Sequence, residues 1–184
     1  MKIFGIGTDI VNIKRIKKIL KNNGTRFKNK IFSESEINYC EKNDIQVILG
    51  EWGQPYKVHD TNLNMQNAFT GATDPKWISL IADHLQHLIK KKDYTCIRYY
   101  NIVNEPNGYW SSIDGNWAEW KEAVTMLDSA ITSRNLDQVT LMGPDATPYD
   151  NEKSQYKGNE WAKQAVLQLN DVLGAYDVHD YPTV

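Results

Sequence analysis

The sequence has little of the features that mark several common classes of protein. Its 184 residues include two cysteines, Cys40 and Cys96, too few for a disulfide framework or a cysteine-based metal site. We expect both to be free thiols in a reducing compartment. The formal net charge is −2 at pH 7, unlike the strongly basic surface of a nucleic-acid-binding protein. No apolar run is long enough to cross a membrane, so neither nucleic acid nor a membrane is an expected partner.

Two signals at the level of short motifs are also missing. No G-x-G-x-x-G pattern follows a strand-like segment, which argues against a dinucleotide-binding fold. The amino terminus has no signal-peptide core, because Asp9 interrupts its apolar stretch and lysines begin at Lys14. The sequence as written therefore predicts a cytoplasmic protein.

Charge and aromatic residues are distributed unevenly along the chain. Residues 1–42 carry ten Lys or Arg against four Asp or Glu, a net charge of +6. Residues 43–184 carry eleven against nineteen, a net charge of −8, and contain all six tryptophans. This contrast predicts two domains of separate origin, one over residues 1–42 and one over residues 43–184.

The first part predicts a strand followed by two helices. Residues 1–10 are apolar enough for a strand, and an amphipathic helix from about Asn12 has isoleucines on one face and lysines around the other. Ser33 and Glu36 form a capping box for a second helix through about Lys42. A solvated surface explains the basic face of the first helix, and recognition of an acidic partner is the alternative.

The stretch GIGTDIVNIKRIKKIL, with the later GTRF and KIFSESEINYC, closely resembles the amino-terminal third of holo-acyl-carrier-protein synthase. That family transfers 4′-phosphopantetheine from coenzyme A to acyl carrier protein. The resemblance implies an Mg²⁺ ligand at Asp9 and a basic surface, including Arg15 and Arg26, that faces the carrier protein. The second carboxylate of the family, in an Arg-Phe-Ala-x-Lys-Glu-Ala helix, has no counterpart after Lys42. We therefore expect this site to be incomplete.

The second part predicts alternating strands and helices. Short apolar strands are expected at residues 46–50, 96–103, 139–143 and 176–179. Helices are expected from Asp74, from Asn116 and over residues 159–173. Their apolar residues recur with helical spacing and are expected in the core, namely Trp77, Ile81, Leu85, Leu88, Trp117, Trp120, Val124, Leu127, Ile131 and Trp161. Four strands that alternate with three helices predict an α/β fold with a parallel sheet.

The stretch YYNIVNEPNGYW ends one of these strands in Asn104, Glu105 and Pro106. Asn-Glu-Pro at a strand end resembles the fourth-strand motif of retaining glycoside hydrolases built on (β/α)₈ barrels. The resemblance implies that Glu105 is the general acid/base and that Asn104 binds a sugar hydroxyl. The alternative is that Glu105 is an ordinary loop carboxylate.

The same resemblance extends to other strand ends. Glu51 and Trp52 would correspond to the third strand of such a barrel, and His179 and Tyr181 to the sixth. Trp52 and Trp110 would stack on sugar rings, with ordinary packing as the alternative for each. The fold predicted for the whole chain is thus a partial TIM-type barrel, covering the third to sixth strand units, preceded by a β-α-α segment of different origin.

The expected function is retaining hydrolysis of a β-linked polysaccharide without a cofactor. The nucleophile of this clan is a glutamate that ends the seventh strand, and no counterpart occurs before Val184, so we expect an incomplete site. One alternative is the phosphopantetheinyl transferase, with Mg²⁺ and coenzyme A, and another is a non-catalytic carbohydrate-binding fragment. We interpret the chain as a fusion joined near residues 39–42, whose hydrolase parent is of a secreted type. The open barrel is expected to self-associate.

Overall fold

The computed structural model describes residues 34–50 and 69–180. The chain divides into two compact units, Met1–Tyr39 and Cys40–Val184, and the sheet belongs to the second. The domain boundary expected near residue 42 stays a prediction. Several predicted features lie outside the described residues, namely the strand over 1–10, the helix from Asn12, Asp9, Arg15, Arg26, Glu51, Trp52 and Tyr181.

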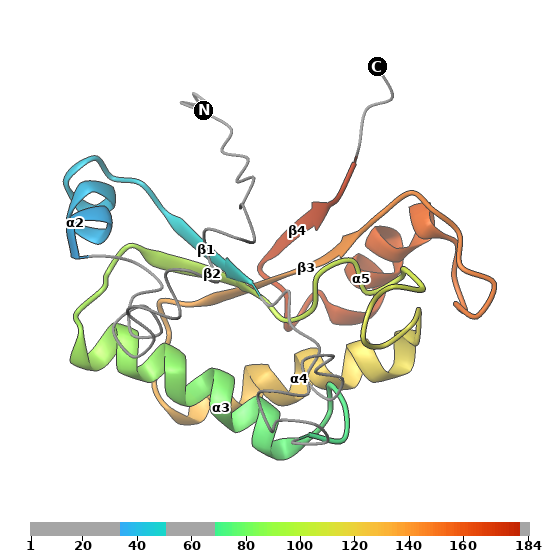
Figure 1. Ribbon diagram of the computed structural model, residues 1–184, viewed down its shortest axis with the longest axis horizontal. Coiled ribbons are helices and arrows are strands. Elements are labelled where there is room, and N and C mark those ends of the chain that lie inside the picture. The colour runs from blue at the N-terminus through green and yellow to red at the C-terminus, as the bar shows by residue number, and fades with distance from the viewer. Residues whose placement is uncertain (1–33, 51–68, 181–184) are drawn as a thin grey trace, which may run out of the picture. The chain divides into compact units, whose positions relative to one another are not determined.

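Four short parallel strands form the sheet of the second unit. In chain order they are β1 (Val47–Gly50), β2 (Ile97–Asn101), β3 (Thr140–Ala146) and β4 (Ala175–Val178). They lie in the spatial order β1-β2-β3-β4, and every neighbouring pair is parallel (Figure 1). The predicted α/β class with a parallel sheet is confirmed. Closure of this sheet into a barrel stays a prediction.

A helix follows each of the first three strands before the next one begins. These helices are α3 (Pro75–Gln86), α4 (Trp117–Ser133) and α5 (Trp161–Leu169), and the 3₁₀ turn Gly158–Glu160 leads into α5. Helices α3 and α4 lie side by side along one face of the sheet (Figure 1), and α5 packs against β3 and β4. Because β-α-β crossovers are right-handed, strands added in one direction bring their helices to one face. The remaining described helix, α2 (Glu34–Lys42), precedes β1.

The helix starts and buried faces agree with the sequence pattern. The side chain of Asp74 accepts a hydrogen bond from the Lys76 N–H at 2.8 Å, and that of Asn116 accepts one from the Glu119 N–H at 3.2 Å. The helix residues predicted to face the core are buried, namely Trp77, Ile81, Leu85, Trp117, Trp120, Val124, Leu127, Ile131 and Trp161. The interpretation of these four tryptophans as core residues is confirmed.

The helix that begins after Asp74 is not a regular α-helix to its end. The α-helix stops at Gln86 and continues as a π-helix over His87–Lys91. A π-turn holds more residues than an α-turn, so the buried face shifts along the chain. Ile89 is therefore buried, whereas Leu88, predicted to be in the core, is only half-buried.

Two strand boundaries also differ. Strand β2 ends at Asn101 instead of Val103, and β3 continues past Pro144 to Ala146. Proline is tolerated there because β3 pairs with β2 only through Thr140 and Leu141, and beyond them only with β4.

The outer strands carry exposed apolar side chains. Ile48 of β1 is 56% exposed and Val178 of β4 is 64% exposed. Exposed apolar residues on edge strands agree with the expectation of self-association, which stays a prediction. Within the described ranges, no helix has the length and apolar character needed to cross a membrane.

Candidate active site

Glu105 lies in a tight loop just beyond the carboxyl end of β2. Its backbone has a φ of 48°, a left-handed conformation that is uncommon for glutamate. Two backbone hydrogen bonds hold the loop, from Gly108 N–H to the Glu105 carbonyl and from Gly115 N–H to the Pro106 carbonyl, both 3.0 Å. The loop thereby fixes Glu105 at the edge of a parallel sheet where binding and catalytic groups collect.

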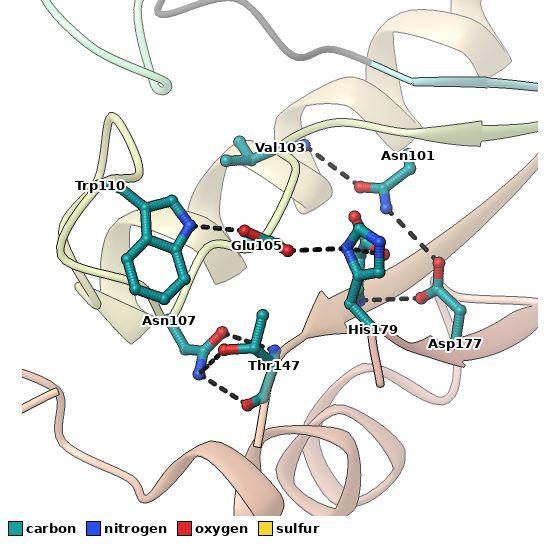
Figure 2. A network of polar contacts seen from close by, with 9 residues as sticks. Asn101, Val103, Glu105, Asn107, Trp110, Thr147, Asp177 and His179 are labelled. Carbon is teal, nitrogen blue, oxygen red and sulfur yellow. Dashed lines mark hydrogen bonds and ion pairs between the residues drawn. The ribbon is translucent and has the colours of Figure 1, made fainter. Parts of the chain in front are cut away.

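The Glu105 carboxyl group is buried between two aromatic rings. Its side chain is 10% exposed. Trp110 Nε1 donates a hydrogen bond to Oε2 at 2.5 Å, and His179 Nδ1 lies 3.0 Å from Oε1 (Figure 2). A ring nitrogen therefore contacts each carboxyl oxygen. A fixed carboxyl group in contact with an imidazole is an arrangement that general acid–base chemistry uses.

Two aspartates extend this arrangement across the neighbouring strands. Asp145, also at a positive φ of 55°, has Oδ1 3.6 Å from His179 Nδ1. The Asp145 N–H donates to Asp177 Oδ1 at 2.8 Å, and Asn101 Nδ2 donates to Asp177 Oδ2 at 3.5 Å (Figure 2). The ends of β2, β3 and β4 are thus joined by one polar network.

Burial changes the proton affinity of both aspartates. Burial and, after it, the neighbouring Asp177 raise the pKa of Asp145 to about 6, while His179 opposes the shift. Burial likewise raises the pKa of Asp177 above its ordinary value. Carboxyl groups whose pKa is raised by burial and by a second carboxyl group are more common at functional sites than elsewhere.

A fully buried amide ties the Glu105 loop to the segment after β3. Asn107 is 1% exposed. Its Nδ2 donates to the carbonyl oxygen of Thr147 at 2.9 Å, and its Oδ1 accepts from the Thr147 N–H at 2.9 Å (Figure 2). Its Nδ2 also donates to the carbonyl oxygen of Tyr149 at 3.0 Å. The Asn107 side chain thus bonds backbone groups of the segment after β3 and joins the two segments, as backbone pairing would in a sheet. The position of Trp110 beside Glu105 therefore depends on it.

The structure brings together three residues of the predicted site, Glu105, Trp110 and His179. Asn104, next to Glu105, is half-buried, and Glu51, Trp52, Tyr181 and Asp9 lie outside the described residues. Sequence reasoning missed four polar groups, Asn101, Asn107, Asp145 and Asp177. The missed signal was a polar residue inside an otherwise apolar strand or directly after it.

The described part of the chain contains no group of three His, Cys, Asp or Glu side chains that could hold a metal ion. Of the two histidines on the helix that begins after Asp74, His84 is half-buried and His87 is exposed. The predicted Mg²⁺ ligand Asp9 belongs to the other part of the sequence.

Comparison with known proteins finds similarity over short stretches near the amino terminus. Holo-acyl-carrier-protein synthase from Chlamydia pneumoniae is 49% identical over 45 residues, which is 24% of this chain and 37% of that protein. The synthase from Ruminiclostridium cellulolyticum is 47% identical over 36 residues, 20% of this chain and 27% of that protein. The synthase from Thermodesulfovibrio yellowstonii is 54% identical over 37 residues, 20% and 33% of the respective chains.

The chain thus spans about a third of the length of the curated relatives it matches. No protein-family model matches it. The names of these relatives support the phosphopantetheinyl transferase alternative better than the glycoside hydrolase interpretation. The glycoside hydrolase interpretation depends on the Asn-Glu-Pro motif and on the geometry around Glu105.

Proposed function

We propose that residues 1–42 are a phosphopantetheinyl transferase segment and that residues 43–184 carry a glycoside hydrolase site centred on Glu105. Different observations support the two assignments. The first is supported by identity of about half to named synthases, and the second by the geometry at the carboxyl ends of β2, β3 and β4. The transferase assignment has the stronger support from relatives.

The transferase assignment involves coenzyme A, Mg²⁺ and an acyl carrier protein as partner. Asp9 would be the metal ligand, and Arg15 and Arg26 would face the acidic carrier. The described residues contain no group of three His, Cys, Asp or Glu side chains that could complete this metal site. Calorimetric titration with coenzyme A, with and without Mg²⁺, tests the assignment. Magnesium-dependent binding that Asp9→Ala removes is expected, and absence of coenzyme A binding would contradict it.

The hydrolase assignment depends on one observation above all. A buried carboxyl group, Glu105, is held by Trp110 and His179 at the end of an inner strand of a parallel sheet. Glu105 would exchange a proton with the glycosidic oxygen of a bound glycan, and His179 would orient the carboxyl group. Such proton transfer contributes typically about 10²–10⁴-fold to a rate.

A non-catalytic carbohydrate-binding fragment is the nearest competitor of the hydrolase. Release of reducing sugar from β-linked glucan and mannan, compared between the full chain and Glu105→Gln, separates the two. A working hydrolase site releases sugar in the full chain and loses that release in Glu105→Gln while it still binds the glycan, an outcome that would also overturn the expectation of an incomplete site. A binding fragment binds glycan in both forms and releases sugar in neither, and failure of both forms to bind would contradict both functions.

We further propose that the sheet is part of a (β/α)₈ barrel. The sequential strand order and the position of α3 and α4 on one face support this assignment. The exposed Ile48 and Val178 would then be positions where further strands or a second copy pair. Analytical ultracentrifugation tests the consequence: the chain is expected to associate, and Val178→Lys to reduce the association. A monomer at high concentration would contradict it.

A further inference from the structure

An aromatic hollow lies beside the Glu105 site. It has a volume of about 320 Å³ and is lined by Gly108, Tyr109, Trp110, Tyr149, Asp150 and Asn151. Its three aromatic residues are unusually accessible: Tyr109 is 74% exposed, Tyr149 56% and Trp110 38%. A cluster of exposed aromatic side chains on a protein surface is a common mark of a binding site.

We propose that the aromatic hollow is a glycan subsite, which holds one sugar ring of a β-linked oligosaccharide next to the linkage that reaches Glu105. The inference rests on the proposed hydrolase function and extends it to residues outside the Asn-Glu-Pro motif. Tyr109, Tyr149 and Asp150 contact the sugar in this subsite, and Trp110 belongs both to the subsite and to the Glu105 site.

The ring geometry suits a flat ligand with polar edges. The centroids of Tyr109 and Trp110 are 4.8 Å apart with an interplanar angle of 79°, and those of Trp110 and Tyr149 are 6.4 Å apart at 77°. Both tyrosines therefore stand nearly perpendicular to the indole, and all three rings line the hollow. A β-linked pyranose has apolar faces that pack on aromatic rings and equatorial hydroxyls around its edge.

The rim of the hollow supplies polar groups for those hydroxyls. Asp150 Oδ1 accepts a hydrogen bond from the Gly158 N–H at 3.0 Å, which fixes the carboxylate on the loop. An ionised carboxylate has about four acceptor positions, so Asp150 can accept from sugar hydroxyls as well. Aromatic walls with a fixed carboxylate at the rim are the combination of apolar lining and few polar groups that small-molecule sites show.

The two loops that form the hollow are fixed to each other before any ligand binds. Asn107 joins them through Thr147 and Tyr149, as described above. Asn151 Nδ2 adds hydrogen bonds to the Asn107 carbonyl and to Asp114 Oδ1, both 3.1 Å. A site formed in advance loses less conformational freedom when it binds.

Trp110 connects the hollow to the acid/base site. Its indole lines the hollow, and its Nε1 donates to Glu105 Oε2. A sugar on the indole is therefore adjacent to the Glu105 carboxyl group. The volume of about 320 Å³ is at the small end of ligand pockets, which limits the subsite to a short part of the chain.

The test is calorimetric titration of the full chain with β-1,4-linked glucose oligomers of increasing length. We expect affinity to rise by about five- to tenfold at one step of chain length, because one more ring then reaches the aromatic hollow. Tyr149→Ala and Tyr109→Ala are expected to remove this step and to leave the affinity for the shorter oligomer unchanged. Tyr39→Ala is the control, since Tyr39 is 63% exposed and does not line the hollow.

Each outcome separates the subsite from the hydrolase function. If oligomers bind and the step persists in both tyrosine variants, the subsite is wrong while the proposed function stands. If no oligomer binds, the proposed function fails and the subsite with it. Three aromatics and a carboxylate can also enclose an organic cation, so tetramethylammonium is titrated in parallel. Its saturable binding, lost in Tyr149→Ala without a glycan step, would overturn the inference.

Discussion

The two regions of this chain differ in charge, aromatic content and relatives. Residues 1–42 are basic, contain no tryptophan and include the stretch that resembles carrier-protein synthases. Residues 43–184 are acidic, contain six tryptophans and form a parallel sheet with a buried carboxyl group at its edge. The contrast teaches that identity to a named relative over a quarter of a chain does not describe the rest of it.

The largest expected effect separates the two regions directly. Asp9→Ala is expected to weaken Mg²⁺-dependent coenzyme A binding by at least about tenfold, because loss of even a supporting group costs about 10–100-fold at metal sites. Glycan binding is expected to stay unchanged in the same variant. Calorimetry with both ligands measures the two affinities on one preparation. A variant that loses both would show that the regions form one functional unit.

The next effect concerns the buried amide that organises the second region. Asn107→Ala removes four hydrogen bonds and leaves the Thr147 N–H buried without its acceptor. We expect a loss of about 2–4 kcal/mol in the free energy of unfolding, measured with urea. Asn170→Ala is the matched control, since Asn170 only accepts a bond from the exposed Tyr176 hydroxyl. A change below about 1 kcal/mol at position 107 would contradict the role of Asn107 in joining the loops.

The sequence predicted the strands and helices of the second region because their apolar residues recur with a clear period. It did not predict the π-helix after Gln86, since a one-residue shift of the helix face leaves no mark in the local composition. It also placed the end of β3 before Pro144, although the proline is tolerated where β3 no longer pairs with β2.

Only the part of the candidate site that leaves a local signal in the sequence was predicted. Glu105, Trp110 and His179 stand in loops or at strand ends, where a polar or exposed aromatic residue is easily noticed. Asp145 and Asp177 are strand residues whose proximity depends on the register between β3 and β4. A pairing across 32 residues cannot be derived from local periodicity, so this half of the network required the structure.

A smaller effect tests how closely Trp110 must approach the Glu105 loop. A Cβ atom at Gly108 would lie 2.3 Å from Cε2 of Trp110, so Gly108→Ala must displace the indole from Glu105. We expect a loss of about 1–3 kcal/mol in the free energy of unfolding, together with weaker glycan binding. Gly50→Ala is the control for glycine substitution, because its Cβ would meet Asn101 at an ordinary 3.5 Å. Unchanged glycan affinity in Gly108→Ala would argue against Trp110 as a shared residue.

The smallest expected effect is a pH dependence of stability that belongs to the second region. The pKa of Asp145 rises from 3.8 to about 6 on folding, so between these values the folded state holds a proton that the unfolded state has released. The contribution of Asp145 to the free energy of unfolding is therefore greatest below about pH 4, and it is lost as the pH rises through about 6. After screening by solvent, we expect a difference of about 1–2 kcal/mol.

Urea unfolding of the chain and of Asp145→Asn from pH 4 to pH 7 measures this contribution. The amide cannot ionise, so the variant should lose the part of the decline that comes from Asp145, while it keeps the backbone N–H bond of residue 145 to Asp177. Asp177, His179 and Glu105 all face this carboxyl group, and the buried Asp177 adds a decline of the same sign. A reduced but not abolished slope is therefore expected. An unchanged slope would mean that the network at the strand ends does not raise the pKa of Asp145. The buried carboxyl groups would then not distinguish the second region from the first.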